Sequence, residues 1–321
     1  MGSLKGWIIV LILILFPLPV LAGQTQENEN QGFFGSVFLG GGVAAGNPSG
    51  LKATDDNKRI SSLNKQSGHQ QEIIPLIMGE FGYSFASTGT KISLTNQKSE
   101  KSYADLVLEQ SLKGLGTVSF SFGYGKEDVW ADPYITGVDR REVDEESYNL
   151  ALEWQEIIGS GFSATLKMSS VEVDKDLIGD RYYDLRRDGE IMMAGIEYLF
   201  PLGKNQVIIP GFNLEREDRD GESNSCKKAG ISLAHIIEFG RWNFTTSLGV
   251  GRREFDKSHP VFHKTREETQ YEFSHLVTYS RPFGWEGCFI HGLLAYSRAD
   301  ANINFFNQDE LTIGTGIGYK F

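Results

Sequence analysis

The sequence predicts an all-β protein, a transmembrane up-and-down antiparallel β-barrel of about 14 strands after a cleaved signal peptide. Three observations predict it: an apolar N-terminal export segment, segments of about 10–12 residues in which apolar and small or polar residues alternate, and connections that alternate between short and long. The spans near Lys91 and Phe289 are poorly patterned, so 12 or 16 strands remain alternatives.

The N-terminal segment has the parts of an export signal. Lys5 supplies a positive charge, residues 7–16 form an unbroken apolar run, and residues 20–22 are small enough for cleavage. A retained membrane anchor is the alternative, but the run is short and is followed by two prolines. We therefore expect a signal peptide at 1–22, a polar periplasmic tail at 23–32 and an outer-membrane barrel at 33–321.

The C-terminal segment shows the strand pattern most clearly. From Leu311 to Phe321, every second residue is apolar or aromatic apart from one threonine, and the residues between are glycine, threonine or lysine. A period of two indicates a strand with one face in an apolar medium. The pattern recurs at 118–125, 148–155 and 242–251. A β-sandwich also alternates, but the span lengths favour a barrel, and Tyr319 and Phe321 resemble the terminal signal that outer-membrane proteins present to the insertion machinery.

The connections set the predicted topology. The short ones, expected in the periplasm, are 87–90, 113–116, 158–161, 201–205, 239–241 and 281–287. The long ones, expected outside the cell, are 45–71, 128–145, 174–187, 218–225, 255–268 and 300–309, and a shorter connection near 96–102 makes the seventh on that side. An even number of strands with both ends in the periplasm follows, as single-chain bacterial barrels require.

Charge and cysteine content limit the partners. The net charge of −11 argues against a nucleic-acid partner, because phosphate binding needs a basic face. Cys226 and Cys288 fall at opposite ends of the predicted wall, so we expect two free thiols. We expect outer-membrane lipids and the barrel-insertion machinery as partners, small solutes as a further class, no cofactor, and a location in the outer membrane of a Gram-negative bacterium.

Few motifs indicate a metal or phosphate site. His259 and His263 have a spacing that could bind metal on a helix, but a proline separates them in a predicted loop. The carboxylates around Gly221 (Asp218, Asp220 and Glu222) fit a turn better than a cation site. The glycines at 40–42 precede no helix, so we predict no phosphate cradle. From the histidine and carboxylate patterns above, we predict no metal site.

Two histidines fall on the row assigned to lipid, where a polar group is costly. His235 and His275 therefore raise the hypothesis of an outer-membrane lipid hydrolase. The nearby Ser232 and Ser274 fall on the lumen row, and the two histidine spans are not neighbours. A bulge or a bond to a neighbouring residue explains the histidines better, and we predict no catalytic residue.

The lumen row is rich in glycine and serine and carries several mid-wall charges. The candidates for lumen selectivity are Glu109, Glu153, Lys167, Glu197, Glu215 and Glu272. Carboxylates along an aqueous bore would raise the local cation concentration. Alternatively, each glutamate pairs with an inward-folded loop arginine such as Arg140, Arg141 or Arg266. The sequence leaves both interpretations open.

Several short motifs resemble a known family. They are residues 61–64 (SSLN), 132–137 (DPYITG), 187–189 (RDG), 200–202 (FPL), 260–262 (PVF) with 264–267 (KTRE), and 284–285 (GW). Together, from about Gly32 to Phe321, the chain resembles a family of Gram-negative outer-membrane β-barrels catalogued as a domain of unknown function. The resemblance implies a barrel in the outer membrane and carries over no catalytic or ligand residue.

Three functional hypotheses follow. The first is a porin-like channel for small hydrophilic solutes with a weak cation preference. The second is a structural or surface-interaction barrel whose bore is filled by loops, particularly 128–145. The third is a lipid-modifying enzyme, which would need a serine beside His235 or His275.

Overall fold

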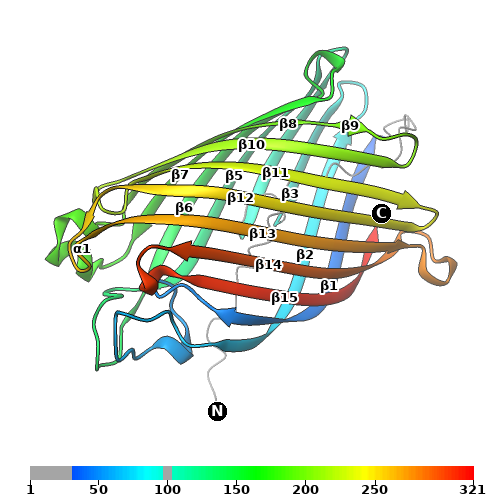
Figure 1. Cartoon of the computed structure of the whole chain (residues 1–321). Coiled ribbons are helices and arrows are strands. Elements are labelled where there is room, and N and C mark those ends of the chain that lie inside the picture. Colours follow the sequence, from blue (N-terminus) through cyan, green and yellow to red (C-terminus); the bar gives the residue numbers. More distant parts are fainter. Residues whose placement is uncertain (1–30, 97–102) are drawn as a thin grey trace.

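The computed structural model describes residues 31–96 and 103–321. Their strands form one antiparallel sheet (Figure 1). Its strands are β1 Gly32–Asn47, β2 Gln70–Phe85, β3 Thr90–Thr95, β4 Ala104–Leu112, β5 Gly116–Trp130, β6 Glu142–Gln155, β7 Phe162–Val173, β8 Gly189–Tyr198, β9 Phe200–Pro201, β10 Gln206–Arg219, β11 Cys226–Phe239, β12 Trp242–His259, β13 Lys264–Ser280, β14 Cys288–Ala301 and β15 Gln308–Lys320. Among these described residues, no helix has the length and hydropathy needed to cross a membrane.

The sheet closes on itself. Each strand pairs with its neighbour in the chain, β15 pairs with β1, and β10 pairs with both β8 and β11. Because β9 has only two residues and continues β8 beyond Leu199, the barrel has 14 spans, which confirms the predicted number. Closure satisfies every strand edge, as a wall surrounded by hydrocarbon requires.

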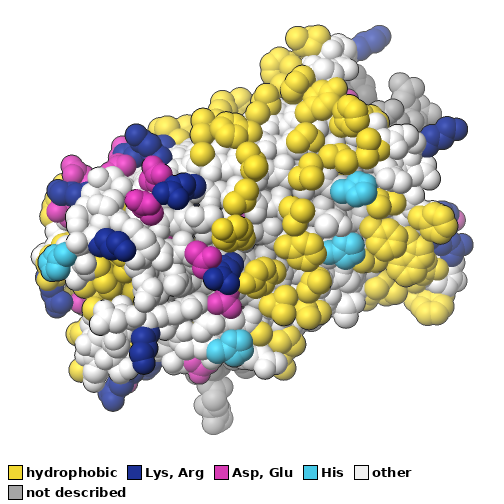
Figure 2. Space-filling model, in the orientation of Figure 1, with side chains coloured by type: hydrophobic (Ala, Val, Ile, Leu, Met, Phe, Trp, Pro, Cys, Tyr) yellow, Lys and Arg dark blue, Asp and Glu magenta, His cyan; other side chains and the backbone are white. Residues whose placement is uncertain are grey.

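The wall has an outward row and an inward row, as the period of two predicts. In β6, for example, Leu150 and Leu152 are exposed on the outside, whereas Glu153 faces inward and is buried. Figure 2 shows apolar side chains gathered over the strands, with most charged side chains towards the end that carries the long connections. An apolar belt around a closed barrel is the arrangement of outer-membrane proteins, and this chain is an outer-membrane barrel.

The connections follow the predicted alternation, but two strand pairs run further than expected. β12 continues to His259 and β13 begins at Lys264, so the loop predicted at 255–268 is only a turn at 260–263. Likewise, β5 and β6 reduce the loop predicted at 128–145 to 131–141. Most outward residues of these extensions are charged, such as Asp144 and Glu267, because they project beyond the membrane, and such a pattern resembles a loop in the sequence.

The long connections carry the short helices near the outer end. They are α1 Leu177–Arg181, η1 Asp55–Asn57, η3 Tyr183–Leu185 and η5 Asn304–Phe306; η2 Ile157–Gly159 and η4 Pro282–Gly284 lie in the opposite, short turns. The predicted signal peptide, nearly all of the predicted polar tail and most of the 96–102 connection lie outside the described residues.

Candidate functional site

The strand register places all six candidate lumen residues on the inward row. Glu153 and Glu197 lie on nearby strands, with Lys167 on β7 between them. Glu153 also accepts a hydrogen bond from Gln155 at 2.6 Å. Glu272 lies on the other side of the barrel, opposite Gly249 in the register. Their role in selectivity stays a prediction.

Two of the glutamates pair with basic residues of the wall that the sequence analysis missed. Lys91 Nζ lies 3.5 Å from Glu109 Oε1. Arg253 Nη2 lies 3.1 Å from Glu215 Oε1 and 2.9 Å from Glu217 Oε1. Both basic residues lie on the inward row: Lys91 is one strand from Glu109, and Arg253 is two strands from Glu215. Such a relation depends on the register between strands and cannot be deduced from a single segment.

The loop arginines do not pair with these glutamates in the way the alternative interpretation supposed. Arg140 donates to backbone carbonyls outside the barrel wall, and Arg266 pairs with Glu268 while stacking on Phe306 at 3.8 Å. The side chain of Arg141 is exposed. Arg140 links two loops, whereas Arg266 lies in β13 and pairs along its own strand, so that pairing hypothesis is wrong for both arginines.

On one side of the lumen, aromatic rings lie against glycines of the wall. Phe38 and Phe289 stack with ring centroids 6.3 Å apart, on the inward face of β1 and β14. A Cβ added to Gly318 would lie 2.1 Å from the Phe289 ring, and one added to Gly316 would lie 2.5 Å from Phe38 Cζ. The glycines of β15 therefore make room for rings that lie against the wall, a role that the sequence analysis did not assign.

The long connections meet in a hydrophobic core of their own, which we call the loop cap. Its buried members are Tyr134, Ile178, Leu185, Ile303, Phe305 and Phe306, with Leu51, Ile60, Leu63, Val261, Phe262 and Ala301 packed against them. These residues come from the connections after β1, β5, β7, β12 and β14 and from the end of β14. Several belong to the motifs that carried the family resemblance, so those motifs converge in space.

The loop cap joins opposite sides of the barrel. Tyr134 follows β5, and His259 ends β12; four strands separate these two hairpins in one direction and six in the other. Nevertheless His259 Nε2 lies 3.0 Å from the Tyr134 hydroxyl. Tyr134 also contacts Phe305, with ring centroids 5.3 Å apart. Because these loops start from nearly opposite points of the ring, the loop cap crosses the outer mouth.

Arg140 and Arg187 anchor the 131–141 loop within the loop cap. Arg140 is buried, donates to the Gly50 carbonyl at 3.0 Å, the Pro133 carbonyl at 2.9 Å and the Asn57 carbonyl, and lies 4.5 Å above the Trp130 ring. Arg187 donates to the Trp130 carbonyl at 2.8 Å and forms a close ion pair with Asp176. Burial lowers the pKa of Arg140 to about 10, which still leaves it charged at neutral pH.

The outward histidines each have a polar neighbour. His275 Nδ1 lies 2.9 Å from the hydroxyl of Thr246, and His235 Nε2 lies 3.4 Å from Gln206 Oε1. His235 and His275 flank Thr246 in the register of β11, β12 and β13. The predicted bond to a neighbouring residue is confirmed.

The serines that a lipid hydrolase would need are not beside these histidines. Ser232 and Ser274 face the lumen, so the hydroxyl next to His275 belongs to Thr246. No local pattern in the sequence indicates this threonine, because its position opposite His275 depends on the register between β12 and β13.

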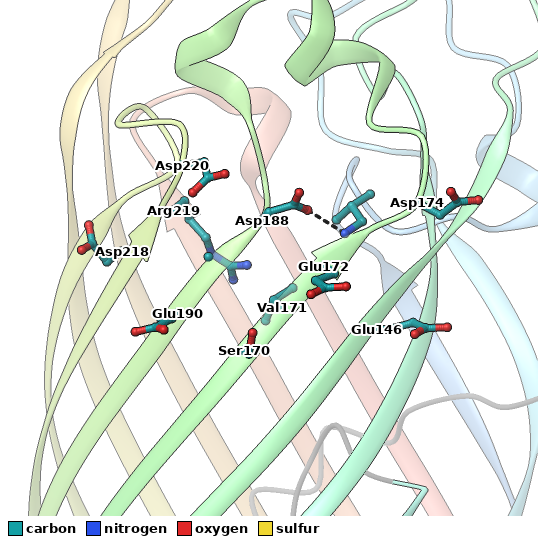
Figure 3. A pocket seen from close by; sticks show the side chains of 12 residues that line it. Glu146, Ser170, Val171, Glu172, Asp174, Asp188, Glu190, Asp218, Arg219 and Asp220 are labelled. Carbon is teal, nitrogen blue, oxygen red and sulfur yellow. Dashed lines mark hydrogen bonds between the residues drawn. The ribbon is translucent and has the colours of Figure 1, made fainter.

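An acidic pocket of about 800 Å³ lies at the outer rim over β6, β7, β8 and β10 (Figure 3). Outward carboxylates of Glu146, Glu172, Glu190 and Asp218 line it. Asp188 is also at the pocket and accepts a hydrogen bond from the Val173 amide at 2.7 Å. Within residues 31–96 and 103–321, no group of three or more histidine, cysteine or acidic side chains is arranged to hold a metal ion.

The remaining predicted features fall at the ends of the wall. Cys226 is buried at the outer end of β11 and Cys288 begins β14 at the opposite end, and both are free thiols as predicted. His263 is exposed while His259 is buried in the loop cap, so they form no pair. Tyr319 and Phe321 are exposed on the outward side, with ring centroids 6.3 Å apart. Their use as an insertion signal stays a prediction.

Comparison with proteins of curated function gave no match. Among solved structures, similar chains include a loop L8 deletion mutant of OmpT, an outer membrane protein of Vibrio cholerae (11% identity, 89% of this chain and 99% of that chain, TM-score 0.40). Others are an anion-selective porin from Comamonas acidovorans (8%, 91% and 100%, 0.42) and an outer membrane channel from Pseudomonas putida F1 (10%, 92% and 98%, 0.44). Residues 32–320 match the family described as "Protein of unknown function (DUF2860)", and the chain belongs to that family.

Proposed function

We propose that the barrel is a channel for small hydrophilic solutes with a weak cation preference, narrowed at its outer mouth by the loop cap. The observation that carries the proposal is the inward row, on which acidic side chains outnumber basic ones. Inward acids include Glu72, Glu80, Asp105, Glu127, Glu145, Glu238 and Glu310 in addition to the five candidate glutamates. Fixed negative charge along an aqueous path favours cations.

The distribution of the inward charges supports a weak rather than a strong preference. Arg253 compensates Glu215 and Glu217, and Lys91 compensates Glu109. Glu153 and Glu197 share Lys167 as a nearby base, because β7 lies between their strands. We infer that these two glutamates supply most of the preference on that side of the bore.

Planar-bilayer recording of the refolded protein tests the proposal. We expect ion current, with a reversal potential in a salt gradient that favours cations. In the double variant Glu153→Gln/Glu197→Gln, the permeability ratio should move towards unity. The matched control is Glu146→Gln/Glu190→Gln, which removes two carboxylates from the outward row of the same two strands and should leave the ratio unchanged. An equal change of the permeability ratio in both double variants would contradict the role assigned to the inward row.

The loop cap favours a second function, a structural or surface-interaction barrel with a closed mouth. The 131–141 loop contributes Tyr134 to the shared core, and this loop is the central part of the segment predicted to fill the bore. If neither the parent protein nor a variant with a loosened loop cap carries current at any voltage, the channel proposal fails and the second function stands.

Outer-membrane lipids, the insertion machinery and small solutes are the partners we propose. The exposed apolar belt supports the lipids, and the outward Phe321 supports the insertion machinery. A lipid-modifying activity is the weakest proposal, because it would have to use Thr246 in place of a serine.

A further inference from the structure

His259 holds the loop cap together where two nearly opposite hairpins meet. Apart from Thr246, the outward row of β12 is apolar as far as Val250 and charged from Arg252 onward, so the end of the strand that carries His259 lies outside the membrane. There the ring is 1% exposed. It packs between Phe262 and Phe306, with ring centroids at 4.8 Å and 5.6 Å. It is thus a buried titratable group that the proposed channel does not use.

Both ring nitrogens of His259 have partners, and these partners fix the neutral form. The backbone amide of Val261 donates to Nδ1 at 3.2 Å, so Nδ1 carries no proton. The proton therefore sits on Nε2, which donates to the Tyr134 hydroxyl at 3.0 Å. A second proton would have to go on Nδ1, where it would point at an N–H donor and break the contact with Val261.

The charged groups around the ring also oppose protonation. Arg266 from β13 stacks on Phe306 and acts on His259 as a like charge, and its own carboxylate partner is Glu268. Lys264 stands opposite His259 in the strand register, and His263 is exposed in the same turn. From the 131–141 loop, the group that faces the ring is the Tyr134 hydroxyl, whose pKa is raised by burial, so it stays neutral.

We propose that protonation of His259 releases the 131–141 loop from the β12–β13 hairpin and opens the loop cap at acidic pH. The release itself concerns only the loop cap. Its consequence for solute passage rests on the proposed channel function. The loop cap would then act as an acid-sensitive gate at the outer mouth.

The sign and size of the effect follow from linkage. Burial, reinforced by Arg266, lowers the pKa of His259 to about 3 in the closed loop cap, whereas a released imidazole returns to about 6.5. The stability that the neutral His259 ring gives to the closed loop cap is fully present above about pH 6.5 and is lost as the pH falls from there to about 3. Between pH 7.5 and pH 5 the ratio of open to closed loop cap should rise about 30-fold.

Amide hydrogen exchange of the membrane-inserted protein tests the proposal. After correction for the intrinsic pH dependence of exchange, protection of peptides from 131–141 should fall about 30-fold between pH 7.5 and pH 5, while the strands stay protected. In His259→Gln, which cannot titrate, the fall should disappear. The matched control is His263→Asn, which removes the exposed histidine of the same turn, at a positive φ that asparagine tolerates, and should keep the fall.

A second variant guards against a misfolded His259→Gln. Tyr134→Phe keeps the ring packing but removes the hydroxyl, so protection should be lower at both pH values and should still fall with acid. The proposal is overturned if the parent shows no pH-dependent loss, or if His259→Gln retains it.

Conductance recorded on the same preparations separates this proposal from the channel. Acid-dependent exchange without current at any pH supports the release of the 131–141 loop and removes the channel. Current and exchange that do not change with pH remove the gate and leave the channel.

Discussion

Replacing Arg140 by methionine should open the loop cap and leave the barrel intact. The guanidinium connects the 131–141 loop to the connection after β1 through the carbonyls of Asn57 and Gly50, and it also binds the Pro133 carbonyl of its own loop. Methionine fills similar space but donates nothing. The three carbonyls then lose a charged donor in a buried setting.

The magnitude can be worked from these contacts. Hydrogen bonds from charged donors contribute roughly 1.5–3 kcal/mol each. Removing the buried cation also removes its desolvation cost, which offsets part of that sum. Adding about 1 kcal/mol for the lost cation–π contact with Trp130 gives a net local cost of about 4 kcal/mol. This corresponds to an opening equilibrium roughly 1,000-fold larger.

Amide hydrogen exchange at neutral pH measures this opening directly. Peptides from 131–141 and 48–69 should lose about 1,000-fold in protection, or reach the unprotected limit, while peptides from β11 to β15 stay unchanged. The control is Arg141→Met, which removes the neighbouring, exposed arginine and should change protection little. A loss below tenfold in Arg140→Met, or an equal loss in Arg141→Met, would refute the assigned role of Arg140.

Three further predictions concern the wall. Gly318→Ala should overpack the wall against Phe289 and cost about 1–3 kcal/mol of the free energy of unfolding, seen as a lower unfolding temperature in heat-dependent gel migration; Phe289→Ala in the same chain should relieve it. Deleting Phe321 should reduce membrane insertion in cells, measured in isolated outer membranes, while the protein refolded in detergent still forms the barrel. His275→Ala should leave any lipid hydrolysis unchanged; a loss of activity would revive a role for Thr246 and the histidine.

Much of the wall could be predicted from the sequence because the determinant is local. A strand with one face in lipid alternates with a period of two, so the facing of Leu152 and Glu153 follows from their places in one segment. The same reasoning identified the outward histidines and the free cysteines. It could not identify the partners of Glu109 and Glu215, because those depend on which residues the register sets side by side.

The extent of the strands was harder to predict than their facing. Beyond the lipid, the outward row of β12 changes to Arg252 and Glu254, and alternation in polarity disappears although the strand continues. The hydrogen-bonded ladder does not depend on lipid contact, so the hairpin extends to His259. This is why a 14-residue loop was predicted where the structure has a turn at 260–263.

By itself, the sequence determined a closed barrel in the outer membrane, since its repeated amphipathic strands leave hydrogen-bonded closure as the solution in hydrocarbon. The loop cap was decided only by the tertiary structure. Tyr134 and His259 are 125 residues apart, and the chain around each of them shows no alternation of apolar and polar residues. Their contact depends on where barrel closure places the two hairpins around the ring, and no local pattern encodes that position.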